Sequence, residues 1–232
     1  MDGLDELEHY LRTARILDVG AFPDPDIPQP GAHPSFRFIL EGGVGALAKP
    51  AHTIGEGDAV VRCEAAAWVL ARQLKWTDLV GTTVLRETDV FPDVEEEVTT
   101  SLQILWPGFE LDADMGQFSD EDIWRAAIFD VLVLHTDRTH NWGAVPGHGQ
   151  KRLKLIDHGY AFREWPGREF ASSFADAKAG QEIPDDLAEP LDDFLGHVET
   201  HDRLEDLLGE QVLEELVARG RTLVEDRTLN HP

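Results

Sequence analysis

The side chains best suited to chemistry lie in two short segments of the second half of the chain. Asp137 and Asn141 are four residues apart in a polar loop that follows an apolar stretch, and Asp157 follows a strand-like run at residues 153–156. Phosphoryl transfer requires an aspartate at the acceptor hydroxyl and oxygen ligands for a divalent cation. The separation of Asn141 and Asp157 along the chain suits a hairpin that would bring the two residues together.

The first half of the chain supplies two further charged residues that such a site needs. Lys49 ends a predicted strand, and Glu64 lies in the first turn of the helix predicted next. A lysine can hold nucleotide phosphates while a carboxylate orients it through a charge-assisted hydrogen bond. Structural interpretations stay open: Lys49 can be a surface residue at a strand end, and Glu64 can stabilise a helix N-terminus. The Asp and Asn residues of the later loops can be turn formers.

The elements that must position these residues follow from the pattern of apolar side chains. Helical spacing predicts a short opening helix through Leu4, Leu7, Leu11 and Ile16. Residues 24–31, with three prolines, are expected to form a loop. A helix is expected at residues 61–74 because its apolar positions form one wide face. Strands are expected at residues 36–40, 44–48, 82–85 and 102–106.

A Pro-Gly pair at residues 107–108 breaks this pattern and separates a strand-rich part from a mainly helical part. Beyond it, a long helix is expected at residues 121–134, with Ser119 as a capping residue, and helical periodicity dominates residues 191–224. The sequence therefore predicts an α+β chain with a first lobe at residues 1–106 and a second lobe at residues 107–232.

Two segments carry the strongest resemblance to a known family, residues 135–142 (HTDRTHNW) and residues 155–162 (LIDHGYAF). They are similar to the catalytic and metal-binding loops of the phosphatidylinositol 3- and 4-kinase-like superfamily, especially type II phosphatidylinositol 4-kinases and their short bacterial relatives. Weaker matches are residues 48–50 (AKP), 62–68 (RCEAAAW) and 101–103 (SLQ). The resemblance covers residues 31–162 and implies a two-lobed, protein-kinase-like fold that uses ATP and Mg²⁺.

The resemblance also implies a role for each matching residue. Lys49 would hold the nucleotide phosphates and Glu64 would hold Lys49. Asp137 would orient or deprotonate the acceptor hydroxyl, while Asn141 and Asp157 would hold Mg²⁺. The remaining ATP-binding residues implied by the resemblance are Ser35 in a loop at residues 31–35 that would cover the phosphates, Gln103 in the hinge, and the backbone of Leu105 and Trp106 beside adenine.

Two departures from the family pattern keep other functions open. Asn141 follows Asp137 by four residues where the family usually has five, and the phosphate loop holds Pro34 and a single glycine. A misplaced metal ligand would suit a pseudokinase that binds nucleotide as a regulatory module, or a nucleotidyl (adenylyl) transferase on a kinase fold. A small-molecule phosphotransferase of the antibiotic-kinase type is a third interpretation.

Charge and composition restrict the partners. Forty-five acidic and 20 basic residues give a formal net charge of −25, which repels nucleic acid and anionic membrane surfaces. The acceptor is therefore expected to be a protein or a small molecule rather than a lipid. Such acidity also fits a high-salt habitat. A single cysteine excludes an internal disulfide, and no apolar run approaches the ~20 residues that span a bilayer. We expect a cytoplasmic protein without stable membrane association.

Positive charge gathers around the Asp157 segment, in contrast to the rest of the chain. The basic residues there are Lys151, Arg152, Lys154, Arg163 and Arg168. Such a group can attract ATP or an anionic acceptor by local electrostatics. A solvated rim of charges is the equal alternative.

Overall fold

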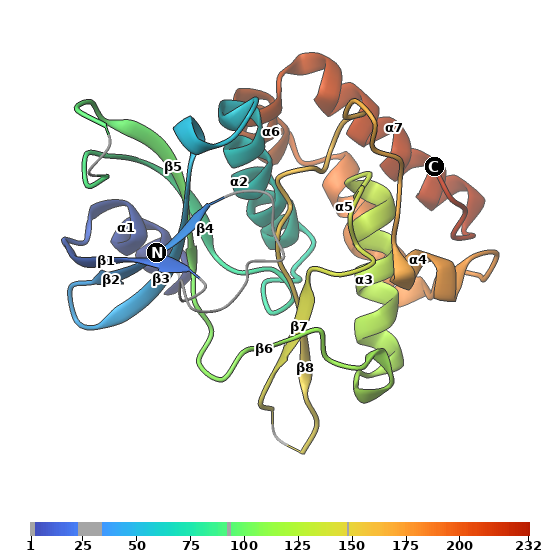
Figure 1. Cartoon of the computed structure of the whole chain (residues 1–232). Coiled ribbons are helices and arrows are strands. Elements are labelled where there is room, and N and C mark those ends of the chain that lie inside the picture. The colour runs from blue at the N-terminus through green and yellow to red at the C-terminus, as the bar shows by residue number, and fades with distance from the viewer. Residues whose placement is uncertain (1–2, 23–33, 92–93, 148) are drawn as a thin grey trace. The chain divides into compact units, whose positions relative to one another are not determined.

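Two compact units make up the computed structural model, which describes residues 3–22, 34–91, 94–147 and 149–232 (Figure 1). The first unit consists of Met1–Ala65 and Gly81–Trp106, and the second of Ala66–Val80 and Pro107–Pro232. Residues 66–80 precede the predicted lobe boundary in sequence, yet they belong to the second unit because their backbone and side chains bond to elements of that unit. The predicted loop at residues 24–31 lies outside the described residues.

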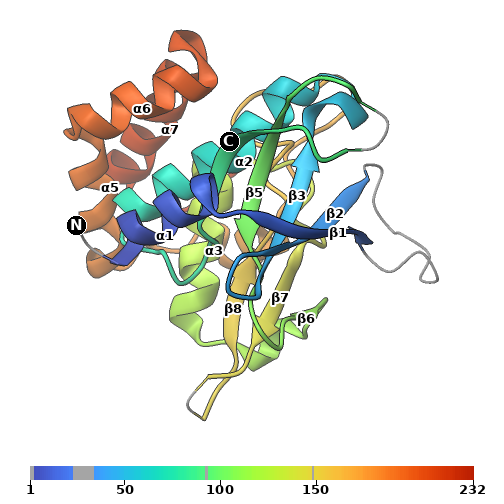
Figure 2. The ribbon, with the colours of Figure 1, turned by 90° about the vertical axis from the view of Figure 1, so that its left-hand side faces the viewer.

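The first unit is built on a five-stranded antiparallel sheet with the order β1-β2-β3-β5-β4. Strands β1, β2, β3 and β5 of this sheet are labelled in Figure 2. Its strands are β1 (Ile16–Phe22), β2 (Ser35–Leu40), β3 (Val44–Pro50), β4 (Thr83–Thr88) and β5 (Val98–Ile104). Helix α1 (Gly3–Thr13) packs against β4 and β5. Helix α2 (Gly57–Gln73) begins in this unit, after the 3₁₀ turn η1 (Ala51–Thr53).

The strands predicted at residues 36–40 and 44–48 are confirmed as β2 and β3, which pair as a hairpin whose turn has a clear local cause. Gly42 and Gly43 take φ values of 84° and 82°, which other residues rarely adopt, and the Gly43 N–H donates to the Leu40 carbonyl at 2.9 Å. The strands then bury alternate residues in one apolar core, which also holds Leu11 of α1. Other members of this core are Phe38, Leu40, Ala46, Ala48, Val84, Phe91 and Leu102.

The strand β1 was not predicted, and its first residue, Ile16, was assigned to the opening helix. The helix ends at Thr13 instead, where Arg86 of β4 donates to the carbonyls of Leu11 and Ala14 at 3.3 and 2.7 Å. Gly20 and Ala21 have low strand propensity, so the sequence gives only a weak signal for this strand. Pairing with β2 overrides that local preference.

The second unit is centred on helix α3 (Asp120–Leu132), which packs against α4, α7 and β8. Its predicted N-cap is confirmed, since the Ser119 hydroxyl accepts from the Asp122 N–H at 3.0 Å. Almost every residue of α3 is buried, which explains why it is apolar on several faces. The remaining helices are α4 (Ser173–Lys178), α5 (Asp185–Leu195), α6 (Val198–Leu208) and α7 (Glu210–Asp226), with the 3₁₀ turn η2 (Met115–Gln117) before α3.

A small antiparallel sheet with the order β6-β7-β8 completes the second unit. Its strands are β6 (Glu110–Leu111), β7 (Trp142–Val145) and β8 (Arg152–Leu155). β7 and β8 pair from Trp142 opposite Leu155 to Val145 opposite Arg152. This is the hairpin that the spacing of Asn141 and Asp157 predicted.

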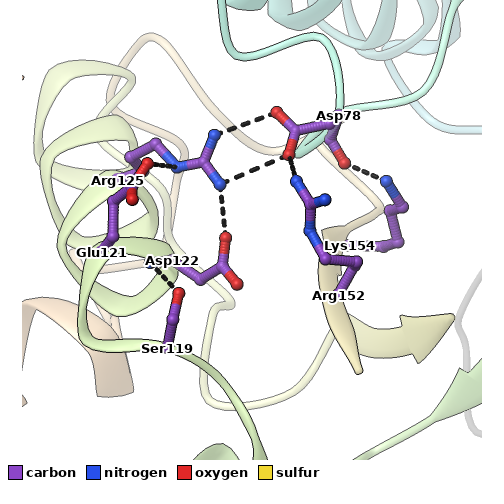
Figure 3. Close-up of polar contacts among 7 residues, drawn as sticks. All are labelled: Asp78, Ser119, Glu121, Asp122, Arg125, Arg152 and Lys154. Atoms are coloured by element: carbon purple, nitrogen blue, oxygen red, sulfur yellow. Dashed lines mark hydrogen bonds and ion pairs between the residues drawn. The ribbon is translucent and has the colours of Figure 1, made fainter. Parts of the chain in front are cut away.

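An ionic network fastens the loop after α2 to this unit (Figure 3). The Asp78 carboxylate accepts from Arg125 of α3 at 2.9 Å and from Arg152 of β8, and the Asp78 carbonyl accepts from Lys154. Arg125 also pairs with Asp122. Burial alone would raise the pKa of the Asp78 carboxyl, but Arg125, Arg152 and Lys154 outweigh it and hold the pKa below its ordinary value. The loop is thereby fixed to both α3 and β8.

Helix α7 is attached to the end of α3 by one half-buried arginine. Arg219 donates to the carbonyls of Leu132 and Phe162 at 2.8 and 2.9 Å. Burial lowers the pKa of Arg219 to about 10, which still leaves it charged at neutral pH. None of the helices in the described ranges combines the length and the apolar character that crossing a bilayer requires.

Candidate active site

Lys49 and Glu64 form an ion pair inside the first unit. The Lys49 Nζ lies 2.5 Å from the Glu64 Oε1, and the two side chains are 12% and 4% exposed. Lys49 is on β3 between Ala48 and Pro50, which point to the other, buried face of the strand. The alternative of a surface lysine is therefore wrong. Glu64 lies about two turns into α2, because this helix begins at Gly57, and so the first-turn interpretation is wrong as well.

The end of β5 carries the residues predicted to meet adenine, and part of their hydrogen-bonding capacity is already used. The Gln103 side chain is buried and donates to the Thr83 hydroxyl at 3.1 Å. The Leu105 N–H donates to the Gly45 carbonyl at 3.0 Å, so a base would meet the Leu105 carbonyl rather than its N–H. The Trp106 ring packs so closely on Gly81 that a Cβ there would lie 2.8 Å from it.

Ser35 is the residue that the family resemblance implied at the phosphate loop. It is the first residue of β2 and pairs with Phe22 of β1. Residues 31–33 of the predicted phosphate loop lie outside the described residues. The role of Ser35 toward a nucleotide stays a prediction.

In the second unit, His135 joins the two segments that hold the predicted catalytic residues. The Asp137 N–H donates to His135 Nδ1 at 3.1 Å, which leaves Nε2 to donate to the Asp157 carbonyl, also at 3.1 Å. The ring is fully buried. A second link runs from the Thr136 hydroxyl to the Tyr160 carbonyl at 2.8 Å. These bonds fix the loop after α3 to the loop after β8.

Arg138 is the central element of this arrangement, and it was not predicted. Its Nη1 donates to the Ile156 carbonyl at 2.6 Å and to the Asn141 carbonyl, and its Nε donates to Asp130 of α3 at 3.1 Å. Asp130 in turn accepts from the Ser172 hydroxyl at 2.7 Å. All three polar side chains are buried. Burial raises the pKa of Asp130, an effect that Arg138 and Ser172 oppose.

A signal for this buried pair was present in the sequence. Asp130 interrupts the apolar run at residues 128–134, and a charge inside a buried helix needs a partner. The identity of the partner could not be deduced, because Arg138 and Ser172 reach Asp130 through tertiary contacts.

Asn141 and Asp157 flank the paired ends of β7 and β8. The Ile156 N–H donates to the Asn141 carbonyl at 3.0 Å, which continues the ladder by one residue. Asn141 and Asp157 both adopt left-handed backbone conformations, with φ values of 63° and 59°. Such conformations are uncommon outside glycine and concentrate at functional sites. Asp137 is joined to the pair by the Asn141 Nδ2, which donates to the Asp137 carbonyl at 3.0 Å. The structure thus brings Asp137, Asn141 and Asp157 together.

The donor set fits a divalent cation bound together with phosphates. With Nδ2 turned toward Asp137, the Asn141 Oδ1 is the atom left for a cation, and Asp157 offers carboxylate oxygens. Mg²⁺ and Mn²⁺ prefer such oxygen ligands and complete their shells with phosphate oxygens and water. No cluster of three or more His, Cys, Asp or Glu side chains that could hold a metal alone occurs within residues 3–22, 34–91, 94–147 and 149–232.

Comparison with solved structures identifies the fold. A crystal structure of the Golgi casein kinase with Mn and ADP bound is 15% identical to this chain, with a TM-score of 0.65 over 97% of this chain and 75% of that one. A second structure of the Golgi casein kinase gives 14% identity and a TM-score of 0.63, over 97% and 74%. No family profile and no curated protein matches the sequence.

These neighbours establish the class of the fold. The chain is an α+β protein with a kinase-like fold, as the sequence predicted. The narrower relationship to phosphatidylinositol 3- and 4-kinases stays a prediction, because the neighbours belong to a different group of kinases.

Proposed function

We propose that this chain is an atypical kinase, which transfers the γ-phosphoryl group of ATP to a hydroxyl of a protein or small molecule with the help of Mg²⁺. The observation that carries the proposal is the hydrogen-bonded grouping of Asp137, Asn141 and Asp157, within a fold shared with a kinase. The neighbour that holds Mn and ADP supports a nucleotide and a divalent metal as ligands. A cytoplasmic location and a distant relationship to phosphatidylinositol kinases are parts of the same proposal.

Each residue then has a role set by its chemistry. Lys49 holds the nucleotide phosphates, and Glu64 holds the lysine amine at 2.5 Å so that little freedom is lost on binding. Asp137, whose side chain is 47% exposed, orients the acceptor hydroxyl and takes up its proton. Asn141 and Asp157 would hold the metal ion, which when bound offsets negative charge on the transferred group.

Transfer from radiolabelled ATP tests the proposal. The protein is incubated with γ-labelled or α-labelled ATP and Mg²⁺ or Mn²⁺, in the presence of protein and metabolite acceptors, and intact mass identifies the group added. We expect γ-label transfer that Asp157→Asn abolishes. Asp192→Asn, an exposed residue of α5, makes the same change of charge and should leave transfer unchanged. If neither label is transferred and ATP with metal does not raise the melting temperature, the proposal is wrong.

Nucleotidyl transfer is the second candidate. It is favoured by the short interval from Asp137 to Asn141, which the Asn141 Nδ2 closes into a tight turn on the Asp137 carbonyl. The two labels distinguish the candidates, because nucleotidyl transfer adds the α-label and leaves the γ-label in pyrophosphate.

A further inference from the structure

The basic residues around Asp157 fall into two groups in the structure. Those on or next to β8 are held by acidic partners: Lys151 by Glu110, and Arg152 and Lys154 by Asp78. The other two, Arg163 and Arg168, follow Asp157 and stack on aromatic rings. Of these two, Arg168 lies beside Asp137.

Arg168 is held on an aromatic platform. Its guanidinium carbon lies 3.7 Å from the centre of the Tyr160 ring, and Tyr160 meets the Trp165 ring edge-on at 5.1 Å. The backbone N–H of Arg168 also donates to the Trp165 carbonyl at 3.0 Å. Stacking restricts the side chain while it leaves the edge of the guanidinium, which carries its N–H donors, open.

The same guanidinium lies beside Asp137. Its Nη1 is 4.0 Å from the Asp137 Oδ2, at the limit of an ion pair, and the two side chains are 32% and 47% exposed. An exposed pair at this distance contributes little to stability. Within the described part of the chain, the Arg168 guanidinium makes no hydrogen bond, so its donors are available to a ligand.

We infer that Arg168 determines the acceptor: it binds a carboxylate or phosphate that the acceptor carries close to the hydroxyl received by Asp137. This inference rests on the proposed kinase function. The 4.0 Å between the two side chains limits the anion to a position a few bonds from the hydroxyl. A planar guanidinium binds carboxylate or phosphate through two parallel hydrogen bonds.

The charge of the whole chain makes this local contact necessary. A net charge of −25 disfavours the approach of any anion, and long-range attraction cannot select one. An anionic acceptor therefore needs a cation at the site itself, and Arg168 is one that is already rigid and turned toward Asp137. The anion can come from a small alcohol or from an acidic residue beside a serine.

Binding measurements test the inference without requiring turnover. Isothermal titration is carried out with glycerol 3-phosphate against glycerol, and with a serine peptide flanked by glutamates against its glutamine counterpart. We expect the wild-type chain to bind one anionic probe about 10- to 100-fold more tightly than its neutral partner. Arg168→Gln should remove that preference. Arg221→Gln, an exposed arginine of α7, makes the same change of charge and should retain it.

Two results of these titrations would contradict the role of Arg168. A wild-type chain with no anionic preference, or an Arg168→Gln variant that keeps the preference, overturns the inference, and the two pairs of probes identify the source of the anion. Once an acceptor is turned over, Arg168→Gln should raise KM for the anionic acceptor by a similar factor with kcat little changed. Anion binding through Arg168 without any transfer would contradict the kinase proposal alone, and transfer without anionic preference would contradict this inference alone.

Discussion

Buried charges are the clearest functional signal at the scale of single residues. Lys49 with Glu64 and Arg138 with Asp130 are ion pairs in which almost no side-chain surface meets water. Replacing such a pair by apolar residues is often neutral or stabilising, because the free-energy cost of removing two charges from water is about as large as the free energy of their attraction. Their presence is explained by the need to hold a charge or a donor at a fixed place, which a phosphate-binding lysine and a clamped loop both require.

Replacement of Lys49 by methionine should separate these contributions. In the proposed mechanism the variant loses the amine that holds the phosphates, and we expect transfer to fall by about 100- to 1,000-fold. It also removes the cation that pairs with the buried Glu64 carboxylate, which should lower the free energy of unfolding by about 3–5 kcal/mol. Urea denaturation and Mg·ATP titration measure the two effects.

The double variant Lys49→Met with Glu64→Gln is the control for this prediction. Neutral glutamine removes the buried carboxylate charge that Lys49 pairs with in the wild type, so stability should recover in large part while nucleotide binding stays weak. Recovery of nucleotide binding together with stability would show that Lys49 acts only as a structural partner.

At the scale of elements, Arg138 couples the β7–β8 hairpin to helix α3. One guanidinium contacts Asp130 of α3, the Asn141 carbonyl and the Ile156 carbonyl, which directly precedes Asp157. Asn141 and Asp157 are the two proposed metal ligands. The left-handed backbone at both ligands is therefore maintained by a contact to the most buried helix of this unit. Arg138 is thus a positioning residue, although it touches no substrate in the proposed mechanism.

Arg138→Lys should weaken the binding of the metal ion, so that transfer requires more Mg²⁺. Lysine keeps the charge, but a single amine cannot reach Asp130 and both carbonyls, so Asn141 and Asp157 lose their fixed separation. We expect the Mg²⁺ concentration for half-maximal transfer to rise about tenfold. Ser172→Ala removes one hydrogen bond from Asp130 at a cost of about 1–3 kcal/mol without touching the carbonyls. It should lower stability and leave the metal dependence as it was.

The Asp78 network gives a second prediction at this scale, concerning pH. The pKa of Asp78 lies below its ordinary 3.8 in the folded chain, so the ionised carboxylate stabilises the fold above that value. The contribution is lost as pH falls through the folded-state pKa. The stability difference between the wild type and Asp78→Asn should be constant near neutral pH and disappear in acid, as measured by urea unfolding from about pH 7 down to about pH 2. An unchanged difference across this range would contradict the assignment.

Local patterns in the sequence predicted the elements better than the contacts between them. The β2–β3 hairpin and helix α3 were predictable because a glycine turn and a serine cap are local signals. The grouping of Asn141 with Asp157 was predictable because a hairpin needs only a short interval of chain. Strand β1 and the contacts of Arg138 could not be predicted, since both depend on residues distant in the sequence. The left-handed backbone at Asn141 and Asp157 likewise becomes visible only in the structure.

For the whole molecule, charge is the dominant feature. Acidic residues exceed basic ones by 25, and many lie on the outer faces of α5, α6 and α7. Self-repulsion among these carboxylates destabilises the folded chain, and the Debye length sets how far it acts, about 10 Å at 0.1 M salt and about 3 Å at 1 M. Salt also screens the attraction within ion pairs, and this effect lowers the stability of the fold as the salt concentration rises. The sign of the salt dependence therefore reports which effect is larger.

We expect the repulsion to be larger, so that the melting temperature rises with NaCl between about 0.05 M and 1 M. Neutralising two exposed carboxylates of α7, in Glu214→Gln with Glu225→Gln, should raise the melting temperature at low salt and have little effect at high salt, because screening has then already removed the repulsion. Differential scanning calorimetry of both proteins over the salt series measures this. A melting temperature that falls with salt would mean that ion pairs such as those of Asp78 outweigh the net charge, and the acidity would then require an explanation other than tolerance of high salt.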